Sequence, residues 1–155
     1  MSTTAVLLIA HGSRHAPAND DLRRLAADLA AVGDYSVVEP AFLELAGPDI
    51  PSGGSRCVER GAGRILMIPY FLSAGVHLLR DLTAARDALQ ARFPAVDFLL
   101  GPPLGPHPIL LRLVSDRARA LDHDGPPPDF ASAAVMAERY TPMGGHESEP
   151  GSPLT

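Results

Sequence analysis

Near its amino terminus the chain reads Val6-Leu7-Leu8-Ile9-Ala10-His11-Gly12-Ser13-Arg14. Five apolar residues are followed by an imidazole, a glycine, a hydroxyl and a guanidinium. An unbroken apolar run of this length, bounded by a turn residue, is typical of a strand that is buried on both faces of a parallel sheet. In open α/β sheets, ligands bind beyond the carboxyl ends of the strands. We therefore interpret His11 as a reactive residue at such an end.

Strand patterns alternate with amphipathic helix patterns along the rest of the chain. Besides the first strand, the predicted strands are 36–43, 64–71 and 96–100. The predicted helices are 19–31 (capped by Asn19 or Asp20), 49–60, 78–92 and 107–121. Four strands alternating with four helices predict an α/β fold of three layers around a four-stranded parallel sheet. Pro40 indicates an irregularity or an edge position for the second strand.

Length and composition indicate one soluble globular domain at residues 1–122, because 155 residues with 46% apolar content can bury a sizeable core. Residues 123–155 lack an apolar period and predict a flexible tail in which 133–140 could form a short helix. The net charge of −5 argues against a nucleic-acid partner. We expect a cytoplasmic protein without a membrane partner, because no span-length apolar run or signal peptide is visible and Cys57 is a lone cysteine.

Right-handed crossovers place the carboxyl ends of all four strands at one edge of the sheet. His11, Glu44 and His77 follow the first three strands, and the glycine-proline turn 101–106 follows the fourth. Imidazole binds Fe²⁺, Co²⁺ and Ni²⁺ and accepts protons near neutral pH. Two imidazoles and a carboxylate leave coordination positions open, which favours a metal ion that is handed on over a closed structural site.

Each of these residues also has a structural interpretation. His11 could only organise its loop, His77 could bond to the backbone at a helix start, and Glu44 could cap a turn. We assign a structural role to His107 at its helix start, and a core position to Cys57.

Other features of the same edge are equally open. Arg14 and Arg80 could bind an anionic substrate or could be solvated or salt-bridged. The small residues Ser73, Ala74 and Gly75 could admit a flat ligand or could form a tight turn. Ser52-Gly53-Gly54 is poor helix sequence, and we expect it to soften the predicted second helix.

Five segments together resemble the CbiX/SirB family of class II tetrapyrrole chelatases, in consistent order over about residues 4–121. They are Ala10–Arg14, Phe42–Pro51, Pro69–His77, Arg80-Asp81 and Gly101–Pro108. The resemblance implies a chelatase-like (flavodoxin-like) fold and a lyase-class enzyme that inserts Co²⁺, Fe²⁺ or Ni²⁺ into sirohydrochlorin, in cobalamin, sirohaem or related tetrapyrrole biosynthesis. It implies no organic cofactor, because the divalent metal is a substrate.

The resemblance also implies roles for single residues. His11 would be the proton acceptor and a metal ligand, His77 the second ligand, and Glu44 an aid to proton removal or metal delivery. The substrate-binding residues would be Ser13, Arg14, Gly47, Leu72, Ser73, Ala74, Gly75, Val76, His77 and Arg80. Gly47 departs from the family, in which this position often carries a polar side chain that meets the substrate.

Short members of the family pair as homodimers, so the resemblance implies a twofold dimer for this single-module chain. Gly47 and the glycine-containing helix also leave open a non-catalytic metal or tetrapyrrole carrier on the same fold. A weaker hypothesis is a phosphatase-like hydrolase that uses His11 and Arg14.

Overall fold

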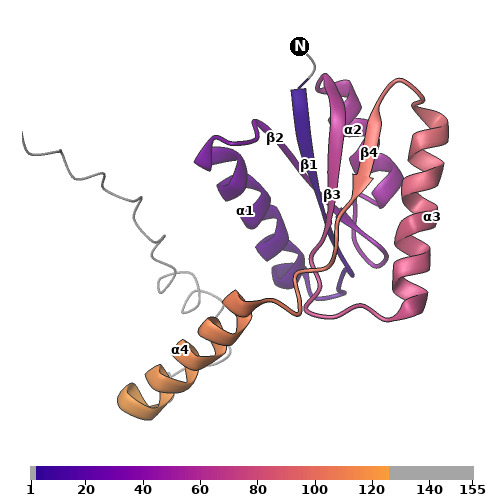
Figure 1. Cartoon of the computed structure of the whole chain (residues 1–155). Helices are drawn as coiled ribbons and strands as arrows, with labels where there is room; N and C mark the ends of the chain where they lie inside the picture. The colour runs from indigo at the N-terminus through magenta and orange to yellow at the C-terminus, as the bar shows by residue number, and fades with distance from the viewer. Residues whose placement is uncertain (1–2, 126–155) are drawn as a thin grey trace, which may run out of the picture. The chain divides into compact units, whose positions relative to one another are not determined.

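The computed structural model describes residues 3–125 (Figure 1). Strands and helices alternate as β1 (Thr3–Ala10), α1 (Ala16–Val32), β2 (Val37–Phe42), α2 (Ile50–Glu59), β3 (Ala62–Pro69), α3 (Val76–Arg92), β4 (Asp97–Leu100) and α4 (Pro108–Asp124). The strand order is β2-β1-β3-β4, and every neighbouring pair is parallel. The predicted α/β fold with a four-stranded parallel sheet is confirmed.

The chain divides into two compact units, residues 1–117 and 118–155. Only residues 118–125 of the second unit are described, and they comprise the end of α4 and Gly125. The predicted tail beyond residue 125, including the helix at 133–140, lies outside the described residues. Within residues 3–125, no helix combines the length and the apolar content that crossing a membrane requires.

Alternating side chains of β1 supply the two halves of the core, which explains its unbroken apolar run. Leu7 and Ile9 pack with residues of α2 and α3, whereas Val6 and Leu8 pack with residues of α1. Helices α2 and α3 accordingly cover one face of the sheet and α1 covers part of the other (Figure 1). Burial on both faces fixes β1 as a central strand.

Pro40 lies in β2, which is an edge strand as its proline predicts. It stands opposite Leu8 of β1. A proline has no N–H to donate, and an edge strand has a neighbour on only one side, so the ladder tolerates the missing donor there.

The predicted cap of α1 at Asn19 or Asp20 is wrong. The helix begins at Ala16, and His15 is its N-cap residue without a side-chain cap bond. Pro17 suits the first turn, where its missing N–H would have had no partner within the helix. Asn19 is instead a buried residue inside the helix, 7% exposed.

Other boundaries also differ from the prediction. Strand β3 ends at Pro69, two residues early, and α3 begins at Val76 after Gly75, its N-cap residue in extended conformation. Val76 and His77 therefore belong to the first turn of a helix and not to the preceding loop. Helix α4 continues to Asp124.

Helix α2 runs unbroken through Gly53 and Gly54, in spite of their poor helix propensity. Both glycines are buried contact points. A Cβ atom at Gly53 would lie 2.9 Å from Leu7 Cδ1 and 3.0 Å from Ala41 Cβ, and one at Gly54 would lie 2.7 Å from Leu89 Cδ2. The low helix propensity of glycine is thus offset by the close packing of α2 on the sheet and on α3.

A valine at Gly53 should destabilise the fold. Overpacking against β1 and β2 costs about 1–3 kcal/mol, which exceeds the gain of less than about 1 kcal/mol in helix propensity. We expect Gly53→Val to lower the free energy of unfolding in urea accordingly. The control is Arg56→Val on the exposed side of the same helix, and equal losses in the two variants would contradict the packing role.

Cys57 should be nearly unreactive in the folded protein. Its side chain is fully buried, and burial raises the pKa of the thiol to about 12. At pH 8 the thiolate population then falls on the order of 10³-fold below that of an unfolded chain. Ellman's reagent should therefore react slowly with native protein and rapidly in guanidinium chloride. Fast stoichiometric labelling of native protein would contradict this burial.

Candidate active site

The ends of β1 and β2 meet through their backbones. The N–H of Leu43 donates to the carbonyl of Ala10, and the N–H of Glu44 donates to that of His11, both at 3.0 Å. Gly12 makes this approach possible, because it has φ +96° and a Cβ atom there would overlap the carbonyl oxygen of Glu44. Glycine alone satisfies both conditions.

This backbone contact sets an imidazole against a carboxylate. Nε2 of His11 lies 3.0 Å from Oε1 of Glu44, and the two side chains are 63% and 57% exposed. An exposed pair of this kind contributes only about 0–1 kcal/mol to stability. The pair is therefore better suited to chemistry at the edge of the sheet than to holding the fold together.

Asn19 fixes the loop that follows His11. Its Oδ1 accepts the N–H of Ser13 at 2.9 Å, and its Nδ2 donates to the carbonyl of Ser13 at 2.8 Å. The Ser13 hydroxyl in turn accepts the N–H of His15 at 3.0 Å. This role of Asn19 was not predicted from the sequence. A signal was present, because Asn19, Leu22 and Ala26 share the buried helical face.

The loop after β2 is closed on itself and tied to α1. The N–H of Phe42 donates to the carbonyl of Pro48 at 2.9 Å. Arg23 lies over the Phe42 ring at 5.2 Å and donates to the carbonyl of Gly47 at 2.9 Å. The Gly47 carbonyl is therefore already engaged, whereas a Cβ atom at Gly47 would meet nothing within 4 Å. This position has room for the side chain that glycine lacks.

The same loop ends in a helix cap. Asp49 accepts the N–H of Ser52 at 2.8 Å, and hydrogen bonds from Ser52 hold the pKa of the Asp49 carboxyl below its usual value. The carboxylate thus stabilises the start of α2.

Large apolar side chains are exposed around the carboxyl edge. They are Leu45 after β2, Tyr70 and Leu72 after β3, and Val76 at the start of α3. Leu45 also has φ +62°, which is uncommon for a residue with a branched side chain. Exposed apolar groups beside a polar pair suit a ligand that has both apolar and polar parts. Leu45 and Tyr70 were not among the residues predicted for the site, although they lie in the segments 42–51 and 69–77.

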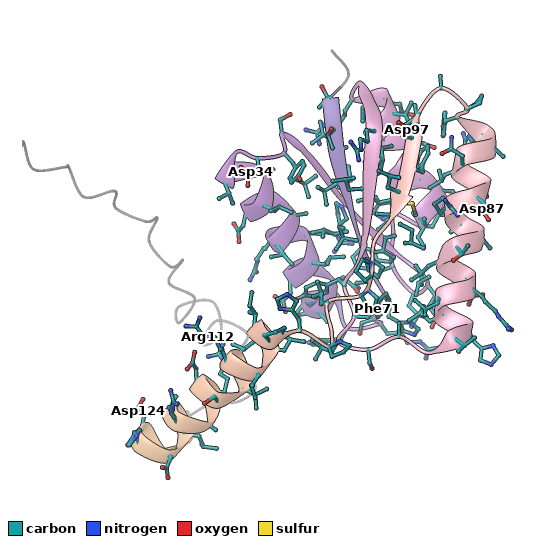
Figure 2. All side chains as sticks on the ribbon, viewed as in Figure 1. Asp34, Phe71, Asp87, Asp97, Arg112 and Asp124 are labelled. Carbon is teal, nitrogen blue, oxygen red and sulfur yellow. The ribbon has the colours of Figure 1, made fainter. Side chains whose placement is uncertain are left out.

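The glycine-proline turn braces the loop after β3. The carbonyl of Phe71, a residue labelled in Figure 2, accepts the N–H groups of Leu104 and Gly105 at 2.9 and 3.4 Å. A side chain at Gly105 would overlap the carbonyl of Leu72. His107 has a local role at the start of α4, where its Nδ1 accepts the N–H of Ile109 at 3.1 Å.

In the described part of the chain, the other predicted site residues make no contact comparable to the one between His11 and Glu44. His77 is exposed in the first turn of α3, Arg80 is exposed one turn later, and Arg14 is exposed in the loop after β1. Among residues 3–125, no group of three or more His, Cys, Asp or Glu side chains is placed to hold a metal ion. The structure thus pairs His11 with Glu44, and His77 does not join them in a three-residue group.

The arrangement can remove a proton from a ligand at the edge of the sheet. A neutral imidazole accepts a proton near neutral pH, and a carboxylate in contact with it stabilises the imidazolium that results. One imidazole and one carboxylate oxygen can also hold a divalent metal loosely, which leaves coordination positions for donor atoms of the ligand.

Comparisons with known proteins show the family to which this chain is related. A sequence model of the CbiX family matches residues 5–121. The chloroplastic sirohydrochlorin ferrochelatase of Arabidopsis thaliana is 36% identical over 112 residues, which are 72% of this chain and 50% of the relative. The chain spans about half the length of the curated relatives it matches, 50% and 47% for the first two.

Two solved structures share the fold. The sirohydrochlorin chelatase SirB from Bacillus subtilis subspecies spizizenii, in complex with cobalt, superposes with a TM-score of 0.71 at 28% identity, over 77% of this chain and 51% of that one. The CbiX protein from Marinobacter aquaeolei VT8 gives a TM-score of 0.64 at 29% identity, over 75% of this chain and 94% of that one. By the match over residues 5–121, by identity and by fold, the chain belongs to the CbiX family.

Proposed function

We propose that this chain is a sirohydrochlorin chelatase that inserts a divalent metal ion into the free-base macrocycle. The observation that carries the proposal is the His11–Glu44 pair, 3.0 Å apart and exposed at an edge that also presents apolar side chains. Membership of the CbiX family supports it, as do relatives named for insertion of iron or cobalt.

His11 acts as the base in this mechanism. Insertion of M²⁺ releases the two N–H protons of the macrocycle, so a proton acceptor is needed beside the entering metal. An imidazole accepts and releases protons near neutral pH, which suits it to this transfer. Glu44 holds the imidazole ring and stabilises its charge after the transfer, and solvent takes the proton away because both groups are exposed.

His77 acts as the second metal ligand in the proposal, and the macrocycle lies along the loop that precedes it. The substrate contacts are Ser13, Arg14, Gly47, Leu72, Ser73, Ala74, Gly75, Val76 and Arg80. Gly75 meets nothing within 4 Å at its Cβ position, which supports close approach of a flat ring. The exposed guanidinium groups of Arg14 and Arg80 are matched to the carboxylates of the substrate.

The metal is Co²⁺, Fe²⁺ or Ni²⁺, since the same ligands serve all three, and the product feeds cobalamin, sirohaem or related tetrapyrrole synthesis. We also propose a homodimer, which the resemblance to short members of the family implies. The free thiol of Cys57 supports the cytoplasm as its compartment.

Removing either histidine should impair metal insertion in different ways. Purified protein is mixed with sirohydrochlorin and each metal in turn, without oxygen for Fe²⁺, and macrocycle absorbance is followed. We expect His11→Ala to lower kcat by about 10²-fold or more, because the base is lost. We expect His77→Ala to raise KM for the metal by roughly tenfold or more, because a ligand is lost.

The matched control is His15→Ala, an exposed histidine in the same loop as His11, which should keep full activity. Full activity in both His11→Ala and His77→Ala would overturn the assignment. Binding of Co²⁺ without multiple turnovers at limiting protein would indicate the carrier in place of the enzyme.

Asn19 should act as a positioning residue for His11. Asn19→Ala removes both bonds to Ser13, and a misplaced base lowers kcat by about 10-fold to 10²-fold while KM for sirohydrochlorin changes little. Asn19→Asp keeps the acceptor for the Ser13 N–H and should retain more activity than Asn19→Ala. Asp28→Ala, exposed on the same helix, is the control. A merely structural role would give variants of lower stability but unchanged kcat when measured well below their melting temperatures.

A further inference from the structure

Leu45 lies in a strained turn directly after Glu44. It has φ +62°, and the N–H of Ala46 donates to the carbonyl of Glu44 at 2.8 Å. A hydrogen bond between residues two apart, with positive φ at the residue between them, defines the rarer and more strained form of γ-turn. The Cβ atom of a leucine is crowded against the backbone in this conformation, whereas glycine or asparagine adopts it at lower cost.

The leucine side chain gains little from the fold in return. It is 54% exposed, whereas the neighbouring apolar side chains of Leu43 and Ala46 pack against the two halves of the core. The hydrogen bonds that close the loop join backbone atoms to each other or to Arg23, so they do not involve the leucine side chain. An unfavourable backbone conformation combined with an exposed apolar side chain indicates a binding role at this position.

The order of the strands places Leu45 and the loop after β3 on opposite sides of His11. The order is β2-β1-β3, so the loop after β1 leaves the sheet between the other two loops (Figure 1). Neighbouring strands are about 4.8 Å apart, which separates the ends of β2 and β3 by roughly 10 Å. The substrate contacts proposed after β3 include the exposed side chains of Leu72 and Val76. The contact proposed after β2 is Gly47, which has no side chain, so an apolar contact on this side has to come from Leu45.

We propose that Leu45 packs against one face of the bound sirohydrochlorin, beside the point where the metal enters. This inference rests on the proposed function and adds a substrate contact to it. The base and the metal must reach the nitrogen atoms at the centre of the ring, so residues next to them meet the face of the ring and not its carboxylate-bearing rim. Consecutive Cα atoms are about 3.8 Å apart, so the side chain of Leu45 starts within that distance of Glu44. A leucine there also has no donor atom that competes for the metal.

Binding of sirohydrochlorin in the absence of metal, followed by the change in its absorbance or fluorescence, tests this contact. We expect Leu45→Asn to raise the Kd for sirohydrochlorin, and its KM in the insertion assay, by roughly tenfold or more, because covering a leucine side chain contributes on that order. Asparagine tolerates positive φ, so the turn is kept. The kcat and the KM for the metal should be nearly unchanged, because His11 and Glu44 remain.

Further variants separate binding from stability. Leu45→Met keeps an apolar side chain of similar volume and should keep a Kd close to that of the wild type. Leu45→Gly should raise Kd as Leu45→Asn does, yet its midpoint of unfolding in urea should not fall, because glycine adopts this φ freely. The matched control is Val32→Asn, which should leave Kd unchanged. Val32 is 73% exposed at the end of α1, where the chain has returned to the opposite edge of the sheet.

Several results would contradict the contact. Equal Kd in wild-type, Leu45→Asn and Leu45→Gly protein would overturn it and leave the proposed function intact. A lower kcat at unchanged Kd would show that Leu45 positions Glu44 and does not touch the macrocycle. A changed molar mass in light scattering at unchanged Kd would assign Leu45 to an interface between copies instead. Wild-type protein that binds sirohydrochlorin but inserts no metal would overturn the enzyme alone, and wild-type protein that does not bind sirohydrochlorin would overturn both proposals.

Discussion

The backbone contact between the ends of β1 and β2 is the constraint on which the candidate site depends. Gly12 adopts φ +96° with its Cα hydrogen directed at the Glu44 carbonyl, where any side chain would collide. The backbone N–H of Glu44 in turn donates to the carbonyl of His11. The imidazole and the carboxylate meet because backbone hydrogen bonds hold the ends of β1 and β2 together. This close approach requires a residue without a side chain at Gly12.

The surrounding contacts support this joint from three sides. Asn19 holds the loop after β1 through the backbone of Ser13. Arg23 ties the loop after β2 to α1 by reaching the carbonyl of Gly47. The turn at Leu104 and Gly105 braces the loop after β3 through Phe71. All three contacts end on backbone atoms, so they fix loop positions while leaving the edge free for a ligand.

Much of this plan could be predicted from the sequence because it follows from periodicity and chain direction. The apolar run before His11 identifies a central parallel strand, and alternation with helices sends His11, Glu44 and His77 to one edge. Local helix propensity alone does not explain α2, where tertiary packing decides. Gly53 and Gly54 have poor helix propensity, yet the helix persists because Leu7 and Leu89 occupy the space beside them.

Asn19 illustrates the same limit for polar residues. Asparagine is a preferred N-cap residue, so its position near a helix start predicts that it caps that helix. Its actual partner is the backbone of Ser13, six residues earlier in the loop that leads into the helix. The capping rule considers only N–H groups two or three positions further along the helix, so it does not specify this partner. The left-handed conformation of Leu45 is likewise set by the closed loop around it and not by any preference of leucine.

The weak contribution of the His11–Glu44 contact to stability bears on the proton transfer proposed for this pair. Two exposed side chains contribute little to stability through their own contact. The distance between the two side chains is therefore set by the backbone of Gly12 and Glu44 and by the hydrogen bonds between Asn19 and Ser13. None of these groups titrates near neutral pH. In the proposed reaction, these backbone and amide contacts need not change when the imidazole accepts a proton, because none of them involves the imidazole ring. Preorganisation of the base by uncharged backbone contacts is what a repeated deprotonation reaction requires.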